Sequence, residues 1–272
     1  MPVSERQIAE FAEHHLWKFP FDTSPRHLAG PGDPRHVTHG LAAAGWPRTP
    51  SDPLSPKIVL HSPDHRTSLR FNPYASTWWA LRAEPTDTMS GWYAQFSELV
   101  PAEILSSLTD ALHTPPPAKD PDPWQTLTAA GWLPDDQGVA RSPDGMCRVA
   151  AYPLDRKEPM DWRVVAHEQG YGQPDGREIW SAWFNSHTPI HLVNAFVTAL
   201  VDTTPLQREM YARTAHYSAT HERSPLTPQQ VVGAHTTRLD ALRAQARAAQ
   251  RRKPNTTVAP PPPGRTTTPI RR

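Results

Sequence analysis

The pattern of hydrophobic and polar positions along the chain occurs twice. LAAAGW at 41–46 returns as LTAAGW at 127–132, and HSPDHRTSLRFNP at 61–73 returns as RSPDGMCRVAAYP at 141–153. The stretch 92–112 then aligns with 180–200 without a gap. A repeat of this size is small for an independent hydrophobic core, so we expect the two units to be more stable packed together than apart.

Within each unit, the periodicity predicts four short strands between two helices. The predicted strands are 57–61, 66–71, 76–83 and 91–97 in the first unit, and 137–141, 146–152, 160–167 and 178–184 in the second. Asp-Pro pairs at 33–34 and 122–123 are typical of a helix start, and the Ala-Gly-Trp sequence ends that helix with a glycine cap. Closing helices begin at Pro101 and Pro189. Ser-Pro-Asp favours a tight turn between the first two strands.

The predicted fold class is α+β, with two tandem repeats of a four-stranded antiparallel sheet with flanking helices, a C-terminal helix and a disordered basic tail. The expected divisions are an N-terminal helical lead-in (1–32), a first repeat (33–115), a second repeat (120–205), a helical extension (206–252) and a Pro/Arg-rich tail (253–272). In the lead-in, Ser4 and Gln7 form a capping box. The tail has too few aliphatic side chains to order by burial.

Strand alternation assigns the side chains to two faces of each sheet. One face is apolar and holds the helices, with Trp79, Trp92, Trp162 and Trp180 in the core. The other face mixes arginine with aromatic side chains, namely Arg70, Trp78, Arg82 and Tyr93 in the first unit and Arg148, Arg163 and Trp183 in the second. Such a surface is typical of proteins that bind single-stranded nucleic acid. The alternative is that the two open faces pack on each other or on the flanking helices.

Charge is distributed unevenly. Residues 1–205 hold 16 Lys and Arg against 24 Asp and Glu, whereas 206–272 hold 12 against 3. We call residues 1–205 the acidic body; its net negative charge repels a polyanion and so weakens the case for nucleic acid on the sheets. The basic end, which includes Arg251, Arg252 and Lys253, offers a second and salt-sensitive route to a phosphate backbone. This end could equally contact a partner or the acidic body, or have no specific role.

Few other chemistries are indicated. Cys147 is the only cysteine, so an intramolecular disulfide is excluded. The apolar run 192–201 is about half of a membrane span, which predicts a cytoplasmic protein without membrane contact. No nucleophile elbow or phosphate loop is present, and the histidine pairs 36/39 and 187/191 lack a third ligand. We therefore expect no catalytic residues, no cofactor and no metal.

The doubled Ser-Pro-Asp turn, the Ala-Gly-Trp helix end, the tryptophan strand and the Pro-started closing helix resemble the SPDY domain family, domain of unknown function 317. The resemblance covers about residues 20–205. It implies a tandem-domain actinobacterial protein, in a family without an established biochemical activity. It supports the architecture and supplies no reaction.

These observations predict a non-enzymatic macromolecule-binding protein. The first hypothesis is that DNA or RNA binds through the basic tail and the Arg/aromatic sheet faces. The alternative is a protein-protein interaction adaptor without nucleic-acid binding, whose open faces or helix 227–250 dock a protein partner.

Overall fold

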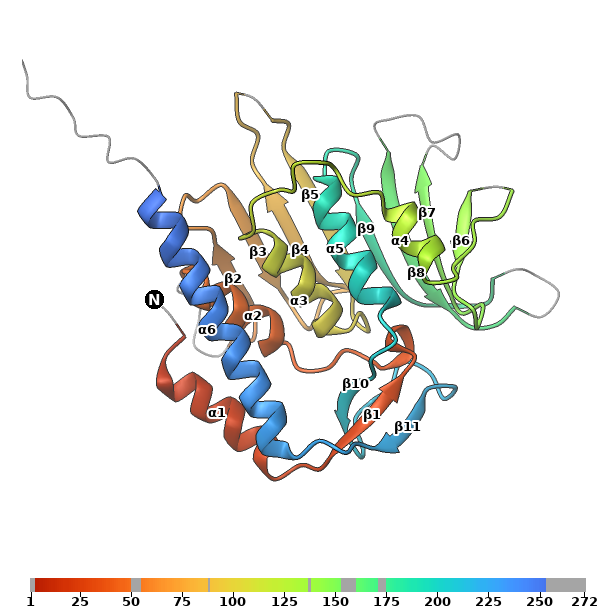
Figure 1. The fold of residues 1–272 in the computed structure, drawn as a ribbon, viewed down its shortest axis with the longest axis horizontal. Coiled ribbons are helices and arrows are strands. Elements are labelled where there is room, and N and C mark those ends of the chain that lie inside the picture. Colours follow the sequence, from red (N-terminus) through yellow and green to blue (C-terminus); the bar gives the residue numbers. More distant parts are fainter. Residues whose placement is uncertain are drawn as a thin grey trace, which may run out of the picture.

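Two antiparallel sheets, of eight and three strands, organise the computed structural model of the chain (Figure 1). The structure describes residues 3–49, 55–87, 89–136, 138–152, 160–170 and 175–252, and the side chain of residue 252 is not described. The tail 253–272, for which we expect disorder, lies outside the described residues.

The large sheet contains all eight predicted strands. In the first unit these are β2 (Ile58–His61), β3 (Thr67–Phe71), β4 (Thr77–Ala83) and β5 (Trp92–Ser97); in the second they are β6 (Val139–Arg141), β7 (Cys147–Tyr152), β8 (Asp161–His167) and β9 (Glu178–Phe184). Every strand of this sheet lies within its predicted range. The strand order β2-β3-β4-β5-β9-β8-β7-β6 shows that the two units join edge to edge.

The join is the antiparallel pair β5–β9. Its register pairs Ala94 with Phe184, Gln95 with Trp183 and Phe96 with Ala182. Because Gln95 and Trp183 occupy equivalent places in the aligned repeats, this register places a pseudo-two-fold axis between them. The open faces therefore lie side by side in one continuous sheet, and the alternative in which they pack on each other is wrong.

Four helices of the two units cover one face of this sheet, namely α2 (Arg35–Ala43), α3 (Ala102–Ala111), α4 (Pro123–Ala129) and α5 (Ile190–Val201) (Figure 1). The four tryptophans predicted for the core are buried beneath them. At the join, the Phe96 and Phe184 rings lie 5.5 Å apart and both contact Phe196. One apolar core therefore serves both units.

Glycine ends both opening helices, as the sequence predicts. Gly45 and Gly131 have φ angles of +92° and +81°, in the left-handed region. Beyond Gly131, the Trp132 amide donates to the Leu127 carbonyl at 2.9 Å, which satisfies a helix-end acceptor. Only glycine adopts this conformation without a steric cost.

We expect Gly131→Ala to lower the free energy of unfolding by about 1 kcal/mol, because a Cβ disfavours the left-handed conformation. The site is open, with no atom within 4 Å of the added Cβ, so the cost comes from the backbone alone. Gly233→Ala is the matched control: it is equally open but lies within a helix, where alanine is expected to stabilise by about 1 kcal/mol. Urea unfolding of both variants measures the difference, and equal signs would contradict the argument.

The Ser-Pro-Asp turns have the same hydrogen bonds in both units. Ser62 Oγ donates to Asp64 Oδ1 at 2.6 Å and accepts from the Thr67 amide at 2.9 Å. In the second unit, Ser142 bonds to Asp144 and to the next strand in the same way. These aspartates are therefore turn-forming residues, as expected.

The flanks are not purely helical, so this part of the prediction is wrong. Besides α1 (Glu5–Leu16), with its predicted capping box, and α6 (Pro228–Arg252), they contain η1 (Arg26–Leu28) and three strands, namely β1 (Pro20–Ser24), β10 (Leu206–Glu209) and β11 (Thr220–Arg223). β1 pairs with both later strands and so joins the two ends of the chain. The strands are short and their partners are far away in the sequence, so local alternation does not reveal them.

Helix α6 packs on α1 and α2 of its own chain (Figure 1). On the side that faces them, Leu239 and Leu242 are buried and cluster with Val3 and Ala43. A protein partner could dock on this side of helix 227–250 only by displacing these contacts. Among the described residues, no helix combines the length and the apolar character that a membrane crossing requires.

Candidate nucleic-acid interface

One row of side chains crosses the open face of the large sheet. In register order, its members are Val59, Arg70, Ala80, Gln95, Trp183, Arg163, Ala150 and Val139. Arg70 and Arg163 are four strand spacings apart, or about 19 Å at ~4.8 Å per strand. Gln95 and Trp183 lie between them, at the join of the two units.

Two aromatic side chains meet at the centre of this face. The Tyr93 and Trp183 rings lie 4.7 Å apart at an interplanar angle of 69°. Tyr93 is 40% exposed and Trp183 is half-buried. The segment after β9 fixes β5 here, since Asn185 Oδ1 accepts from the Tyr93 amide at 3.0 Å. We call Tyr93 and Trp183 the aromatic pair; it exists only because the two repeats share one sheet.

A groove of about 630 Å³ lies next to the aromatic pair, over the first unit. The residues that shape it are Ser68, Arg70, Ala80, Arg82, Tyr93 and Gln95. Ala80 lies between Arg70 and Gln95 in the register, so a single methyl group stands between two long side chains. We call this hollow the Ala80 groove. Strand alternation predicts the arginines and Tyr93 on this face but gives no sign of the small residue that makes room between them.

The arginines of the face differ in their pairing. Arg82 Nε lies 3.1 Å from Glu84 Oε1, and Arg163 Nη2 lies 3.0 Å from Glu178 Oε2. Both pairs are solvent-exposed, so each is worth less than about 1 kcal/mol and exchanges readily for another anion. Arg70 is exposed and forms no ion pair within the described residues.

Arg148, which we predicted for this surface, is held in a separate network. Its Nε lies 3.1 Å from Asp175 Oδ2, and Asp175 also binds Arg141 and lies 3.4 Å from His167 Nε2. Burial alone would raise the pKa of Asp175, but the hydrogen bond from Arg141 and the charge of Arg148 lower it. The open face of the second unit is therefore partly closed by its own ion pairs.

Trp78 also departs from the prediction. The register between β4 and β5 shifts at Thr77/Trp79, so Trp78 lies in a bulge and leaves the alternation of the strand. Its ring meets Phe71 edge-on at 5.9 Å and packs against the hydrophobic core. The structure thus brings together Arg70, Arg82, Tyr93, Trp183 and Arg163.

The residues predicted for the second route lie elsewhere. Arg251 is exposed in the last turn of α6. The Arg252 side chain and Lys253 lie outside the described residues. Their part in nucleic-acid binding stays a prediction.

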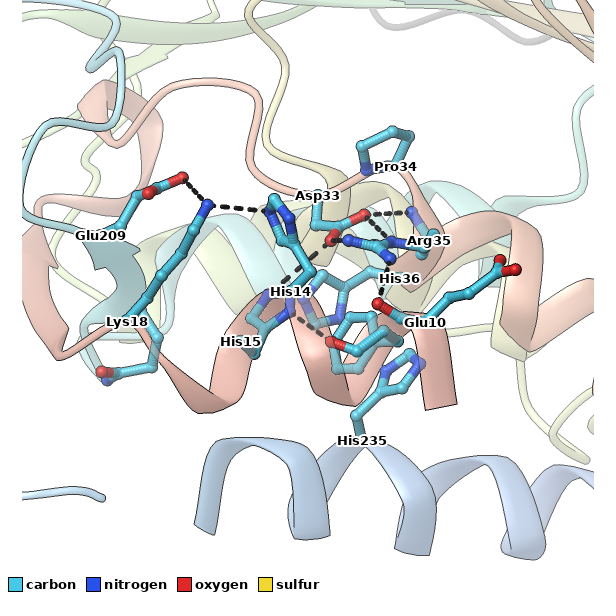
Figure 2. A network of polar contacts seen from close by, with 12 residues as sticks. Glu10, His14, His15, Lys18, Asp33, Pro34, Arg35, His36, Glu209 and His235 are labelled. Atoms are coloured by element: carbon cyan, nitrogen blue, oxygen red, sulfur yellow. Dashed lines mark hydrogen bonds and ion pairs between the residues drawn. The ribbon is translucent and has the colours of Figure 1, made fainter. Parts of the chain in front are cut away.

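A larger cavity, of about 1,120 Å³, lies between α1, the segment 31–36, α3, β10 and the start of α6. Its five carboxylates each meet a cation, in the pairs Asp33–Arg35, Glu103–Arg208, Asp110–Arg238, Asp202–Arg26 and Glu209–Lys18. Figure 2 shows the part of this network around Asp33 and Lys18.

The carboxylates of this cavity are therefore neutralised by cations of the same chain. Burial opposes the charge of Asp33, but the hydrogen bonds and charge of Arg35 lower its pKa to about 2, so it is ionised. In the described ranges, no three His, Cys, Asp or Glu side chains are grouped to hold a metal ion. We interpret the network as the connection between the flanks and the two units.

Comparison with protein families gives one match. The family model described as SPDY, Domain of unknown function (DUF317), matches residues 61–118 and 141–206. Each match runs from the Ser-Pro-Asp turn to the closing helix of one unit. No curated protein and no solved structure matches the chain.

Proposed function

Because the chain belongs to the SPDY family and carries two copies of the domain in tandem, we propose that the copies act as one surface that binds nucleic acid without catalysing a reaction. The site is the open face of the joined sheet, with the aromatic pair at its centre. The basic end of the chain adds attraction to phosphate that does not depend on base sequence.

One observation carries this proposal: the join between the units brings Tyr93 and Trp183 into contact, with Arg70 and Arg82 on one side and Arg163 on the other. Aromatic side chains stack on any base, and arginine neutralises the phosphate backbone. A sheet with this arrangement can hold a strand by its bases and by its backbone at once.

The acidic body does not oppose binding at this place. The carboxylates beside Arg82 and Arg163 belong to exposed pairs, and an incoming phosphate can replace them at small cost. The first unit also presents Arg70, whose guanidinium has no carboxylate partner within the described residues for a phosphate to displace.

The test is fluorescence anisotropy with labelled single-stranded oligonucleotides. We expect Tyr93→Ala and Trp183→Ala each to weaken binding by about 5- to 150-fold, the equivalent of ~1–3 kcal/mol for one stacked base. Affinity of the unchanged protein should fall steeply between about 50 and 200 mM salt.

Tyr217→Ala and Trp17→Ala are matched controls, because both rings are highly exposed and lie outside the large sheet. They should bind like the unchanged protein. An equal loss in the controls, or no binding by the unchanged protein at low salt, would reject the proposed function.

A further inference from the structure

We infer that the Ala80 groove is a pocket for one unpaired nucleobase of the bound strand. This inference rests on the proposed function and deepens it, because it selects single strands over duplexes. It also assigns the pocket to the first unit alone.

The shape of the groove carries the first step. The side chain of Ala80 is a single methyl group, and its register neighbours Arg70 and Gln95 are long. In the adjacent row, Ser68, Arg82 and Tyr93 are consecutive register partners and wall the hollow along the strands. Its volume of about 630 Å³ lies within the usual range of small-ligand pockets, about 300–1,000 Å³.

The chemistry of the walls carries the second step. Tyr93 offers a ring and Arg82, its direct cross-strand partner, offers a planar guanidinium, the two kinds of group on which unpaired bases stack. Gln95 and Ser68 offer an amide and a hydroxyl, which can pair with the edge of a base. Within the described residues, neither of these two side chains has a hydrogen-bond partner.

Arg70 completes the pocket at its outer edge. It is exposed and lies one strand from Ala80, so its guanidinium can reach the phosphate of a nucleotide whose base occupies the hollow. A duplex cannot use this site, because its bases are stacked and paired inside the helix.

The second unit has no equivalent pocket. In the aligned repeats, Arg163 stands in the place of Ala80, Ala150 in the place of Arg70 and Ser181 in the place of Tyr93. The hollow is therefore filled, and both its phosphate contact and its stacking ring are absent. The second unit contributes Trp183 and Arg163 to the common face, and we expect one base pocket per chain.

The decisive variant is Ala80→Phe, which fills the groove while the aromatic pair and Arg70 remain. Its affinity for a labelled single strand should fall at least tenfold, towards the affinity for the duplex of the same sequence. Phenylalanine is favoured on a half-exposed strand, so the fold should persist, which circular dichroism and thermal melting check. Ala80→Ser, which leaves the groove open, is the control and should bind like the unchanged protein.

A second variant tests the groove independently, in case Ala80→Phe does not fold. Gln95→Leu keeps a side chain of similar size at an exposed position but removes the amide, and it should also weaken single-strand binding. If Ala80→Phe and Gln95→Leu bind normally while Tyr93→Ala does not, the face binds nucleic acid but the groove holds no base.

Two further outcomes would overturn the inference. Equal affinity of the unchanged protein for a duplex and for its single strand would show that unpaired bases are not required. Tight binding of poly-glutamate together with no binding of any oligonucleotide would reject the proposed function as well, and would favour an acidic protein partner.

Discussion

Replacement of Arg208 by methionine is expected to lower the free energy of unfolding by about 3–5 kcal/mol, because it leaves a buried carboxylate without its partner. The Arg208 side chain is 3% exposed, and its Nη1 and Nη2 donate to Glu103 Oε1 and Oε2 at 2.6 and 3.0 Å. It also donates to the carbonyls of Ala29 and Gly30. One side chain of β10 thus fastens the N-terminal segment and α3 together.

The charge state of Glu103 explains the size of this effect. Burial would raise the pKa of Glu103, but the charges of Arg208 and His36 hold it below its usual value, so the carboxylate is ionised in the fold. Without Arg208, that carboxylate must either stay charged at a buried position without its guanidinium partner or take up a proton.

Denaturant unfolding measures the change, with Arg6→Met as the control. Arg6 also forms an ion pair, with Glu10, but its side chain is 87% exposed, so its removal should cost less than about 0.5 kcal/mol. The double variant with Glu103→Met should recover much of the loss, because neither charge remains buried. A cost for Arg208→Met no greater than that for Arg6→Met would show that the buried pair does not fasten the flank.

The sequence was sufficient to predict the eight strands of the large sheet because the alternation occurs twice and each copy checks the other. The glycine ends of the opening helices could be predicted for a related reason. A position that must be left-handed, such as Gly131, tolerates few residue types. These features depend on interactions between residues close in the chain.

The join between the units could not be predicted in this way. Only three residue pairs form it, among them Gln95–Trp183, and an apolar strand edge gives no sign of whether it pairs or stays free. The candidate site could be predicted only in part for the same reason. Its arginines and Tyr93 follow from alternation, but the contact of Tyr93 with Trp183 depends on the join, and the loss of Trp78 depends on a bulge.

Helices α1, α2 and α6 meet at a cluster of histidines that the sequence pattern did not indicate. The Phe11 ring is fully buried between the rings of His15 and His235, at centroid distances of 4.1 and 3.9 Å. His39 Nδ1 lies 3.3 Å from His235 Nε2, so at least one of these two rings is neutral. Figure 2 shows His15 and His235 beside the ion pair of Asp33 and Arg35.

The surroundings of this cluster lower the pKa values of its histidines. Burial lowers the pKa of His39 to about 4, and the nearby charge of Arg35 acts in the same direction. Burial lowers the pKa of His235 to about 2, and His36, His39 and Arg238 lower it further while Asp33 opposes them. In the unfolded chain both histidines return to about 6.5.

Acid should therefore begin to destabilise the fold as the pH falls below about 6.5. Above pH 6.5 both histidines are neutral in both states and stability is at its full value. As the pH falls below 6.5, these histidines bind protons in the unfolded chain but stay neutral in the folded protein. Stability then declines by up to about 1.4 kcal/mol per pH unit for each histidine, down to pH about 4 for His39 and about 2 for His235.

Urea unfolding measured near pH 7 and near pH 5 tests the upper part of this pH range, above the interval from 3.8 to about 2 in which protonation of Asp33 affects stability. The double variant His39→Leu with His235→Phe removes both groups and should be markedly less sensitive to pH over this interval. His187→Gln changes an exposed histidine and should keep the full sensitivity. An unchanged slope in the double variant would mean that other groups cause the acid sensitivity, and that α1, α2 and α6 are not held together by neutral histidines.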